Sequence, residues 1–322
     1  MKSYKQLTYE QRCQIYALKK TNNSQQAIAN VIGVTQSAIS RELKRNSGNR
    51  GYRFKQAQGL SDERRLRSTK ALKMTEPLVL LINKKIKVRW SPEQISGWLD
   101  ATKGIKLSHE TIYRHIWSDK RSGGQLYLYL RRKGKTYQSR AKSLAGRGHI
   151  INRVSIDERP AIVEGKSRVG DWEIDLVIGK GHSGAIVTIV ERSLSFTVSK
   201  RIFNKKADTV TKATIELLKP YKNAVHTITA DNGKEFAYHE KMTKALEAPV
   251  YFADPYCSWQ RGLNENTNGL LRQYWPKDTD FKKVSASEVK TVILELNNRP
   301  RKKLGYKTPS DLMKKYVASI AA

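Results

Sequence analysis

Residues 169–203 read "VGDWEIDLVIGKGHSGAIVTIVERSLSFTVSKRIF" and predict three consecutive β-strands. In the first strand apolar and acidic side chains alternate, so Glu173 and Asp175 share one face. Asp175 lies mid-strand between apolar neighbours, where a carboxylate is unfavourable unless it is paired or bound to a cation. We therefore take Asp175 as a candidate metal ligand and Glu173 as a candidate auxiliary. The intervening "GKGHSG" lacks the spacing of a phosphate-binding loop and predicts a hairpin turn.

A second acidic residue ends another apolar run. Residues 225–240 read "VHTITADNGKEFAYHE", in which a β-branched strand stops at Asp231 and is followed by Asn-Gly. An Asp-Asn-Gly sequence is common in turns, so a purely structural turn is one interpretation. A metal ligand held at the tip of a strand is the other.

A third acidic residue, Glu265, lies on a helix that we expect to begin near residue 260. The residues that share its azimuth are all polar or small: Arg261, Asn268, Gly269 and Arg272. Leu263, Leu270 and Tyr274 supply the apolar face that a helix on a sheet requires. The polar stripe therefore faces either a site or water.

The order of these elements predicts a fold. The chain from residue 169 gives three strands, a helix, a strand, a helix, a short strand and a helix. This order is that of a ribonuclease-H-like α/β fold with a mixed five-stranded sheet, in which the first and fourth strands are adjacent. Asp175, Asp231 and Glu265 would then converge. Three neighbouring carboxylates repel one another, and two Mg²⁺ ions would relieve that repulsion and support phosphodiester displacement.

The sequence of the N-terminal region predicts a DNA-binding module. Residues 24–46 read "SQQAIANVIGVTQSAISRELKRN", which gives two short helices separated by Gly33, with Thr35 capping the second. This is the helix-turn-helix pattern, and an ordinary helical hairpin with a solvated basic face is the alternative. The small Ala29 favours the close crossing of a helix-turn-helix. The predicted DNA-contact residues are Gln36, Ser37, Ser40, Arg41, Lys44 and Arg45.

A second, weaker helix-turn-helix pattern lies at residues 90–117. Ser91, Pro92 and Gln94 predict a capped helix start, and a turn around Gly104 leads to a second cap at Ser108. The turn is longer than in the first module. Farther along, residues 131–149 read "RRKGKTYQSRAKSLAGRGH" and predict a flexible basic linker that can lie along phosphates.

Composition limits the class of protein. The 322 residues carry a formal net charge of +32, and residues 1–150 hold 32 Lys and Arg against 9 Asp and Glu. Such an excess indicates a polyanionic partner, most plausibly double-stranded DNA. Cys13 and Cys257 are too far apart for a Cys-x-x-Cys zinc motif and imply no disulfide framework. Because we find neither a membrane-length apolar stretch nor a signal peptide, we expect a cytoplasmic, nucleoid-associated bacterial protein and no membrane partner.

Several blocks together resemble a known family. The sequence is similar to bacterial insertion-sequence DDE transposases, most closely the IS-thirty family, over nearly the whole chain. The blocks that carry the resemblance are "LTYEQRCQIYALKK", "AISRELKRN", "SPEQISGWL", "SHETIYRHIW", "GDWEIDLVIG", "TADNGKEF", "YCSWQRGLNENTNGLLRQYWPK" and "NNRPRKKLGYKTPSDL". The 33 residues between Asp231 and Glu265 match the spacing of that family. In that family glycine is commoner than isoleucine immediately before the first aspartate. Ile174 at this position leaves the metal role of Asp175 untouched.

The resemblance implies a function and an assignment of residues. Asp175, Asp231 and Glu265 would be the catalytic metal ligands for two Mg²⁺ ions, for which Mn²⁺ could substitute, and Arg272 would contact DNA phosphate. The implied reaction is hydrolysis that frees a 3′-hydroxyl at the element end, followed by strand transfer to another phosphodiester. Terminal inverted repeats would be bound by the N-terminal helix-turn-helix, and joining two ends requires a homodimer or a higher oligomer.

Two other functions fit parts of the pattern. One is a transcriptional regulator with a retired catalytic domain, although all three acidic residues are present. The other is a different nuclease of the same fold, which does not need two DNA readers. The predicted organisation is a helix-turn-helix domain at 1–50, a basic helical connector at 51–88, a second helix-turn-helix-like domain at 89–121, a basic linker at 122–165, the catalytic core at 166–280 and a C-terminal helical tail at 281–322.

Overall fold

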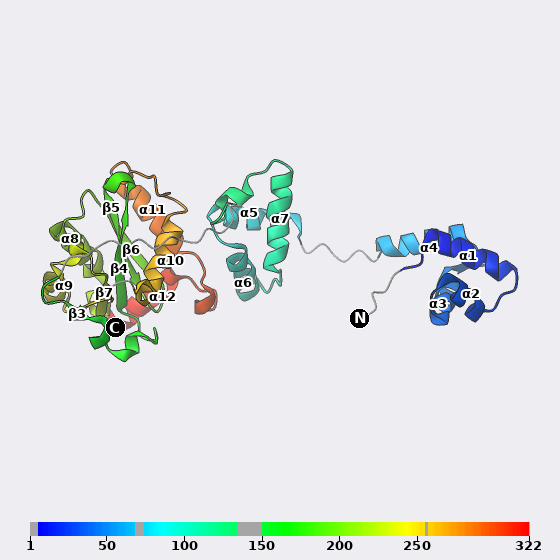
Figure 1. Ribbon diagram of the computed structural model, residues 1–322, viewed down its shortest axis with the longest axis horizontal. Coiled ribbons are helices and arrows are strands. Elements are labelled where there is room, and N and C mark those ends of the chain that lie inside the picture. Colours follow the sequence, from blue (N-terminus) through cyan, green and yellow to red (C-terminus); the bar gives the residue numbers. More distant parts are fainter. Residues whose placement is uncertain (1–5, 68–73, 134–149, 255–256, 322) are drawn as a thin grey trace. The chain divides into compact units, whose positions relative to one another are not determined.

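The computed structural model describes residues 6–67, 74–133, 150–254 and 257–321. The chain forms two compact units, Met1–Met74 and Thr75–Ala322. The first unit is built mainly of helices, and the second contains further helices and a mixed β-sheet (Figure 1).

The first unit contains four helices and one small hairpin. The elements are α1 (Tyr9–Lys20), α2 (Gln25–Ile32), α3 (Gln36–Asn46), β1 (Ser47–Gly48), β2 (Gly51–Tyr52) and α4 (Phe54–Arg67). Local signals set the helix starts, because Thr8, Ser24 and Thr35 each accept a backbone N–H from the first turn. Gly33 ends α2 in the left-handed conformation at φ +75°, which permits the tight turn into α3.

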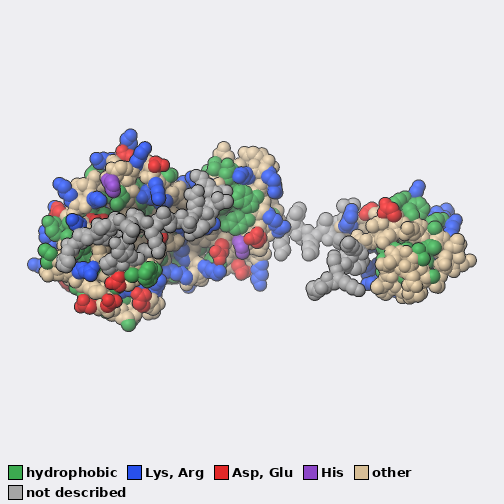
Figure 2. All heavy atoms as spheres, in the orientation of Figure 1, with side chains coloured by type: hydrophobic (Ala, Val, Ile, Leu, Met, Phe, Trp, Pro, Cys, Tyr) green, Lys and Arg blue, Asp and Glu red, His purple; other side chains and the backbone are tan. Residues whose placement is uncertain are grey.

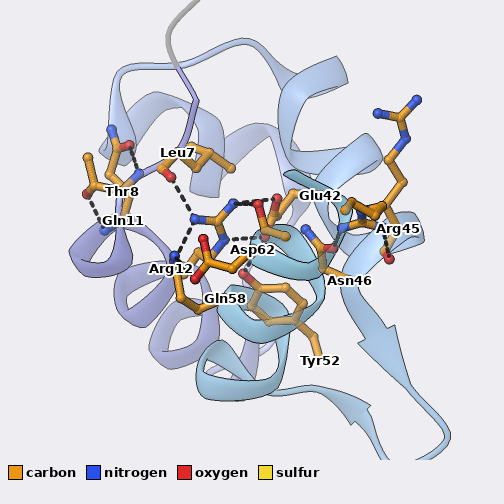
Figure 3. A network of polar contacts seen from close by, with 12 residues as sticks. Leu7, Thr8, Gln11, Arg12, Glu42, Arg45, Asn46, Tyr52, Gln58 and Asp62 are labelled. Carbon is orange, nitrogen blue, oxygen red and sulfur yellow. Dashed lines mark hydrogen bonds and ion pairs between the residues drawn. The ribbon is translucent and has the colours of Figure 1, made fainter. Parts of the chain in front are cut away.

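A buried ion pair connects three helices of this unit (Figure 3). Nε of Arg12 on α1 lies 2.8 Å from Oε1 of Glu42 on α3, and both side chains are buried. The remaining donors of Arg12 reach Leu7 O, Gln58 Oε1 and Ser61 Oγ. The Tyr52 hydroxyl donates to Glu42 as well, at 3.1 Å. Since each charge has several partners, the pair can be buried and can fix the register of the helices.

The first unit is longer than the predicted helix-turn-helix domain. We expected a boundary at residue 50, but α4 packs against α1 and α3 and contributes Ala57 to their hydrophobic core. The expected connector at 51–88 is therefore divided, with α4 in the first unit and α5 in the second. Its basic composition concealed this, because the contacts that α4 makes with the core involve few apolar residues.

The second unit begins with three helices: α5 (Glu76–Lys87), α6 (Pro92–Lys103) and α7 (His109–Arg121). The capping box predicted at Ser91 and Gln94 forms, and Gly104 ends α6 at φ +64°. Ser108 accepts the backbone N–H of Thr111 and caps α7. Helices α6 and α7 pack against each other, and α5 packs against α6.

The sheet has six strands in the order β3-β8-β7-β4-β5-β6. The strands are β3 (Val154–Ser155), β4 (Asp171–Ile178), β5 (Ala185–Glu191), β6 (Thr197–Ile202), β7 (Thr227–Ala230) and β8 (Val250–Phe252). The pairs β4–β5 and β5–β6 are antiparallel, whereas the pairs β4–β7, β7–β8 and β8–β3 are parallel. The first and fourth predicted strands, β4 and β7, are adjacent, which confirms the ribonuclease-H-like order.

The expected count of five strands was wrong by one. Strand β3 has two residues and pairs with β8 at the sheet edge. Two residues in a polar stretch produce no periodic pattern, so only the pairing reveals this strand.

Helices cover both faces of the sheet (Figure 1). On one face α8 (Ala207–Leu218), α9 (His239–Leu246) and α12 (Pro309–Ala321) share a hydrophobic core with Trp172 and Ile174. On the other face α10 (Gly262–Leu271) and α11 (Ala286–Asn297) share a core with Val177 and Ile186. Successive side chains of β4 point to opposite faces of the sheet, so this strand contributes to both cores.

Two predicted boundaries of the catalytic core change. The expected linker at 122–165 includes β3 and buried Ile150, Ile156 and Val163, and its basic centre at 134–149 lies outside the described residues. The expected tail at 281–322 contains α11 and α12, which contribute Val292 and Met313 to the two cores. Residues 150–165 and the tail therefore belong to the sheet domain, because their apolar side chains are buried against it, whereas Leu126–Tyr129 packs against α5 and α7.

Candidate catalytic site and DNA-binding surface

Asp175 and Asp231 are neighbours because β4 and β7 pair in parallel. In their register Glu173 lies beside Thr229, and two residues farther along each chain are Asp175 and Asp231. Adjacent strands are about 4.8 Å apart, so the two carboxylates are held close together by backbone pairing. Asp231 comes directly after β7, and one of its oxygens accepts the backbone N–H of Gly233 at 2.8 Å. The Asn-Gly pair thus forms the turn that lets the chain leave the sheet.

One guanidinium bridges this carboxylate pair. Nη1 of Arg261 lies 3.6 Å from Oδ2 of Asp175, and its Nη2 lies 3.4 Å from Oδ2 of Asp231. Arg261 also donates to the carbonyl of Ile174 at 3.2 Å, while its buried Nε has no partner among the described residues. The two carboxylates therefore share one positive charge, at distances longer than those of a charge-assisted hydrogen bond.

The surroundings of Asp175 favour its neutral form. Burial raises the pKa of its carboxyl to about 6, the charge of Arg261 opposes that rise, and the charge of Asp231 adds to it. Asn268 donates to Oδ2 of Asp175 at 3.0 Å and accepts from Thr188 at 3.1 Å. The side chain is therefore fixed in orientation although its charge is only partly compensated.

Glu265 lies in the first turn of α10 and is exposed. It lines a depression of about 260 Å³ together with Asp175. The other stripe residues, Arg261, Asn268, Gly269 and Arg272, line the same depression. The polar stripe of this helix thus faces Asp175, which decides between the two orientations left open by the sequence.

Arg272 is held by backbone carbonyls at the far end of this depression. Its guanidinium donates to Ile178 O at 2.8 Å and to Pro276 O at 3.3 Å, and burial lowers its pKa from the ordinary value. No acidic side chain of the described residues pairs with it in these contacts. Arg272 thus brings to the lining of the depression a positive charge that these contacts do not neutralise.

Glu173 serves a different purpose from the auxiliary role that we expected. Its side chain is buried, with Oε1 2.6 Å from Nη1 of Arg192. Its other oxygen accepts the backbone N–H of Asn264 at 3.0 Å, which ties the start of α10 to β4. Glu173 thus positions the helix that carries Glu265. The sequence signal was weak, because Arg192 is 19 residues away and only strand pairing brings it near.

The residues present suit a divalent cation chemically, although their described positions do not enclose one. Three carboxylates offer the hard oxygen donors that Mg²⁺ and Mn²⁺ prefer. Within the described ranges, however, no three acidic, histidine or cysteine side chains form a group that could hold a metal ion. The shared contact with Arg261 shows that Asp175 and Asp231 together attract a cation.

The exposed face of α3 forms the candidate DNA reader of the first unit. Gln36, Ser37, Arg41, Lys44 and Arg45 are exposed, and Ser40 is half-buried. The opposite face is buried and contains Ile39, Glu42, Leu43 and Asn46. The predicted contact residues are thus on the accessible side. Sequence reasoning missed the buried roles of Glu42 and Asn46, because both are polar residues next to basic ones.

Comparisons with known proteins decide the family. Residues 3–46 match the model of a helix-turn-helix domain. The chain is 48% identical over 316 residues to the transposase for insertion sequence element IS4351 of Bacteroides fragilis, covering 97% of both chains. It is 37% identical to the transposase InsI for insertion sequence element IS30A of Escherichia coli (strain K12), covering 97% of this chain and 84% of that one. The chain belongs to the insertion-sequence transposases.

A more distant relative and one solved structure are also similar to this transposase. The transposase for insertion sequence element IS1086 of Cupriavidus metallidurans is 34% identical, over 98% of this chain and 96% of that one. The catalytic core domain of BIV integrase aligns with 48% of this chain and 99% of its own at 19% identity and a TM-score of 0.38.

The surface of the transposase fits DNA binding. Lys and Arg side chains are scattered over the visible face of the second unit, and in this view those of the first unit lie toward its edges (Figure 2). The helix-turn-helix match and the net charge of +32 agree with that distribution. Among the described residues, no helix is both long and apolar enough to cross a membrane.

Proposed function

We propose that this transposase binds the terminal inverted repeats of an insertion sequence and catalyses Mg²⁺-dependent cleavage and strand transfer with Asp175, Asp231 and Glu265. The observation that carries the proposal is the geometry of the first two. Asp175 lies within β4 and Asp231 follows directly after the paired strand β7, and the two carboxylates share one guanidinium. Asp175 also lines a depression with Glu265. A nuclease site needs such clustered oxygen donors.

We propose distinct roles for the side chains of the depression and for Asp231, which is beside Asp175 but does not itself line the depression. Asp175, Asp231 and Glu265 would hold the metal, with Asn268 fixing the orientation of Asp175. When bound, two Mg²⁺ ions activate the attacking oxygen and stabilise the leaving oxygen. A bound metal would replace the charge that Arg261 now supplies to Asp175 and Asp231, and Arg272 would hold a DNA phosphate. Mn²⁺ is expected to substitute, since it accepts the same donors.

The DNA-binding and assembly roles follow from the two units. The face of α3 reads base edges through Gln36, Ser37, Ser40 and Arg41, while Lys44 and Arg45 contact phosphates. Strand transfer involves two element ends, so we propose that the active species on DNA is a homodimer or a higher oligomer. The helices α6 and α7 are proposed as a second DNA-contact module.

Replacing the acidic residues tests the proposal directly. Asp175→Asn, Asp231→Asn and Glu265→Gln should each lower Mg²⁺-dependent nicking of DNA carrying the element ends by at least about 1000-fold, because a metal ligand is lost. Binding of the same DNA should be unchanged, since α3 is untouched. Nicking is measured on labelled duplexes and binding by gel shift.

A matched control is Asp208→Asn, which removes an exposed acidic residue at the start of α8. It should cut normally. Normal cutting by any of the three site variants would remove that residue from the proposed set. End binding without any nicking by the intact protein would instead favour a transcriptional regulator, and cleavage of RNA–DNA hybrids without regard to end sequence would favour a different nuclease.

A further inference from the structure

A groove of the second unit borders β6, at the edge of the sheet. It is a groove of about 1000 Å³ between α8, α11 and α12, and every residue of Thr197–Arg201 borders it. Strand β6 pairs with β5 on one side only, because it is the last strand of the sheet. The groove therefore occupies the place that a seventh strand would take.

The free backbone groups of β6 can be identified from its pairing. Glu191 N donates to Phe196 O at the hairpin, so the residues of β6 that face β5 are every second one from Phe196. Thr197, Ser199 and Arg201 consequently direct their N–H and C=O groups into the groove. Asn297 of α11 bonds both groups of Thr197, at 2.9 and 2.7 Å.

The backbone groups of Ser199 and Arg201 have no hydrogen bonds of the kind that Asn297 makes with Thr197 among the described residues. Within the described residues, nothing bonds their outward N–H and C=O groups, and the buried Oγ of Ser199 also has no partner. Unpaired groups on an edge strand are a template for another strand. Asn297 thus caps one end of the edge and leaves the part beside it open.

The walls of the groove are apolar and its rim is basic. Phe203 and Leu294 are 58% and 50% exposed there, so both offer apolar surface to a ligand of the groove. Lys290 and Lys314 are exposed, with no acidic partner among the described residues. The one acidic residue of the rim, Glu216, pairs with Lys200. The rim therefore attracts negative charge.

We propose that this groove binds a partner protein by strand addition, through a short extended segment in which apolar and acidic residues alternate. Such a segment would pair its backbone with Ser199 and Arg201, place apolar side chains against Phe203 and Leu294, and direct carboxylates to Lys290 and Lys314. A second copy fits less well, since its own β6 would bring Lys200 and Arg201, rather than carboxylates, to this basic rim.

The test uses the full-length protein and synthetic peptides. The probe is a fluorescent, N-acetylated heptapeptide of alternating Val and Glu. One control peptide has Lys in place of Glu, and another carries backbone N-methyl groups on alternate residues of the probe. The proposal expects saturable binding of the probe and at least tenfold weaker binding of both controls, because one loses charge complementarity and the other loses strand hydrogen bonds.

Protein variants locate the binding. Lys290→Glu combined with Lys314→Glu should weaken the probe at least tenfold and strengthen the Lys peptide, while cleavage of element ends stays normal because neither residue is in the catalytic depression. Absence of probe binding at about 1 mM, or equal binding of the N-methylated peptide, would overturn the proposal. Dissociation of a dimer by the same variants, with no peptide binding, would assign the groove to a second copy and also overturn it.

Discussion

Arg12, which is buried, and Arg261, which is half-buried, show how differently this chain uses the same charge. Arg12 in the first unit lies 2.8 Å from Glu42, and its other donors bond to a carbonyl, an amide and a hydroxyl. Arg261 in the second unit lies 3.4 and 3.6 Å from two carboxylates, and its Nε has no partner among the described residues. The first contact is complete and holds helices together. The second leaves negative charge to spare, as a site that exchanges one cation for another requires.

The largest expected effect is on the stability of the first unit, and it tests the buried Arg12–Glu42 ion pair. Arg12→Met leaves Glu42 buried without its cation, which should destabilise the first unit by about 3–5 kcal/mol. All six tryptophans lie in the second unit. Urea unfolding should therefore show an early transition by circular dichroism that tryptophan fluorescence does not detect.

The matched control removes both charges. Arg12→Met with Glu42→Leu should recover most of the lost stability, because no unpaired charge remains. A single variant that unfolds at the same urea concentration as the original protein would mean that the Arg12–Glu42 pair is dispensable.

An effect of intermediate size is expected on DNA affinity, through the exposed basic side chains of α3 in the first unit. Arg41 is exposed, and among the described residues its Nε donates to Ser37 O of its own helix. Arg41→Ala should weaken binding to element ends by about 1–3 kcal/mol more than binding to random DNA, as expected for a base contact. The measurement is fluorescence anisotropy at one fixed salt concentration.

Lys44 supplies the comparison on the same helix face. Lys44→Ala should weaken both DNAs about equally and lower the salt dependence, since a phosphate contact carries no sequence information. An equal loss on both DNAs for Arg41→Ala would reassign that residue to phosphate.

The smallest expected effect is on the free energy of unfolding. It tests whether the negative charge of Asp175 is only partly compensated by the groups around it. The pKa of Asp175 is raised from 3.8 to about 6, so its ionised form is disfavoured in the folded state. Stability from this group therefore falls as the pH rises from about 4 to about 6 and stays low above that. Asp175→Asn should stabilise the metal-free protein by about 1–2 kcal/mol at pH 8, because part of the charge remains exposed, and by almost nothing at pH 4.

Tryptophan fluorescence during urea unfolding, in the presence of a chelator, measures this change. Adding Mg²⁺ should stabilise the original protein more than the variant, since a ligand that binds only the folded state raises its stability. Destabilisation by Asp175→Asn at pH 8 would show that the carboxylate is fully compensated and would remove the contrast with Glu42.

Much of the local structure was predictable because its signals lie within a few residues. Ser91, Gln94 and Gly104 determine where α6 begins and ends, and Thr35 caps α3 as expected. The 3.6-residue period likewise predicted the polar stripe around Glu265, which does line the depression. The role of the three acidic residues as metal ligands stays a prediction.

Other features were not predictable because they depend on residues distant in sequence. The affiliation of α4, the two-residue strand β3 and the packing of residues 281–322 on the sheet all arise from contacts across the fold. Glu173 looked like a companion of Asp175, yet strand pairing supplies Arg192 and turns Glu173 into an anchor for α10.

The order of the amino acids specifies a strongly basic chain, a capped helix with an exposed basic face and three acidic residues at an ordered spacing. Helix caps and periodicity act over a few residues, and so they can be read directly. In contrast, tertiary packing places Arg261 between Asp175 and Asp231, sets Glu173 against Arg192 and leaves an edge of β6 open. Those outcomes depend on which strands pair and which helices cover them, and burial of the two cores selects that arrangement.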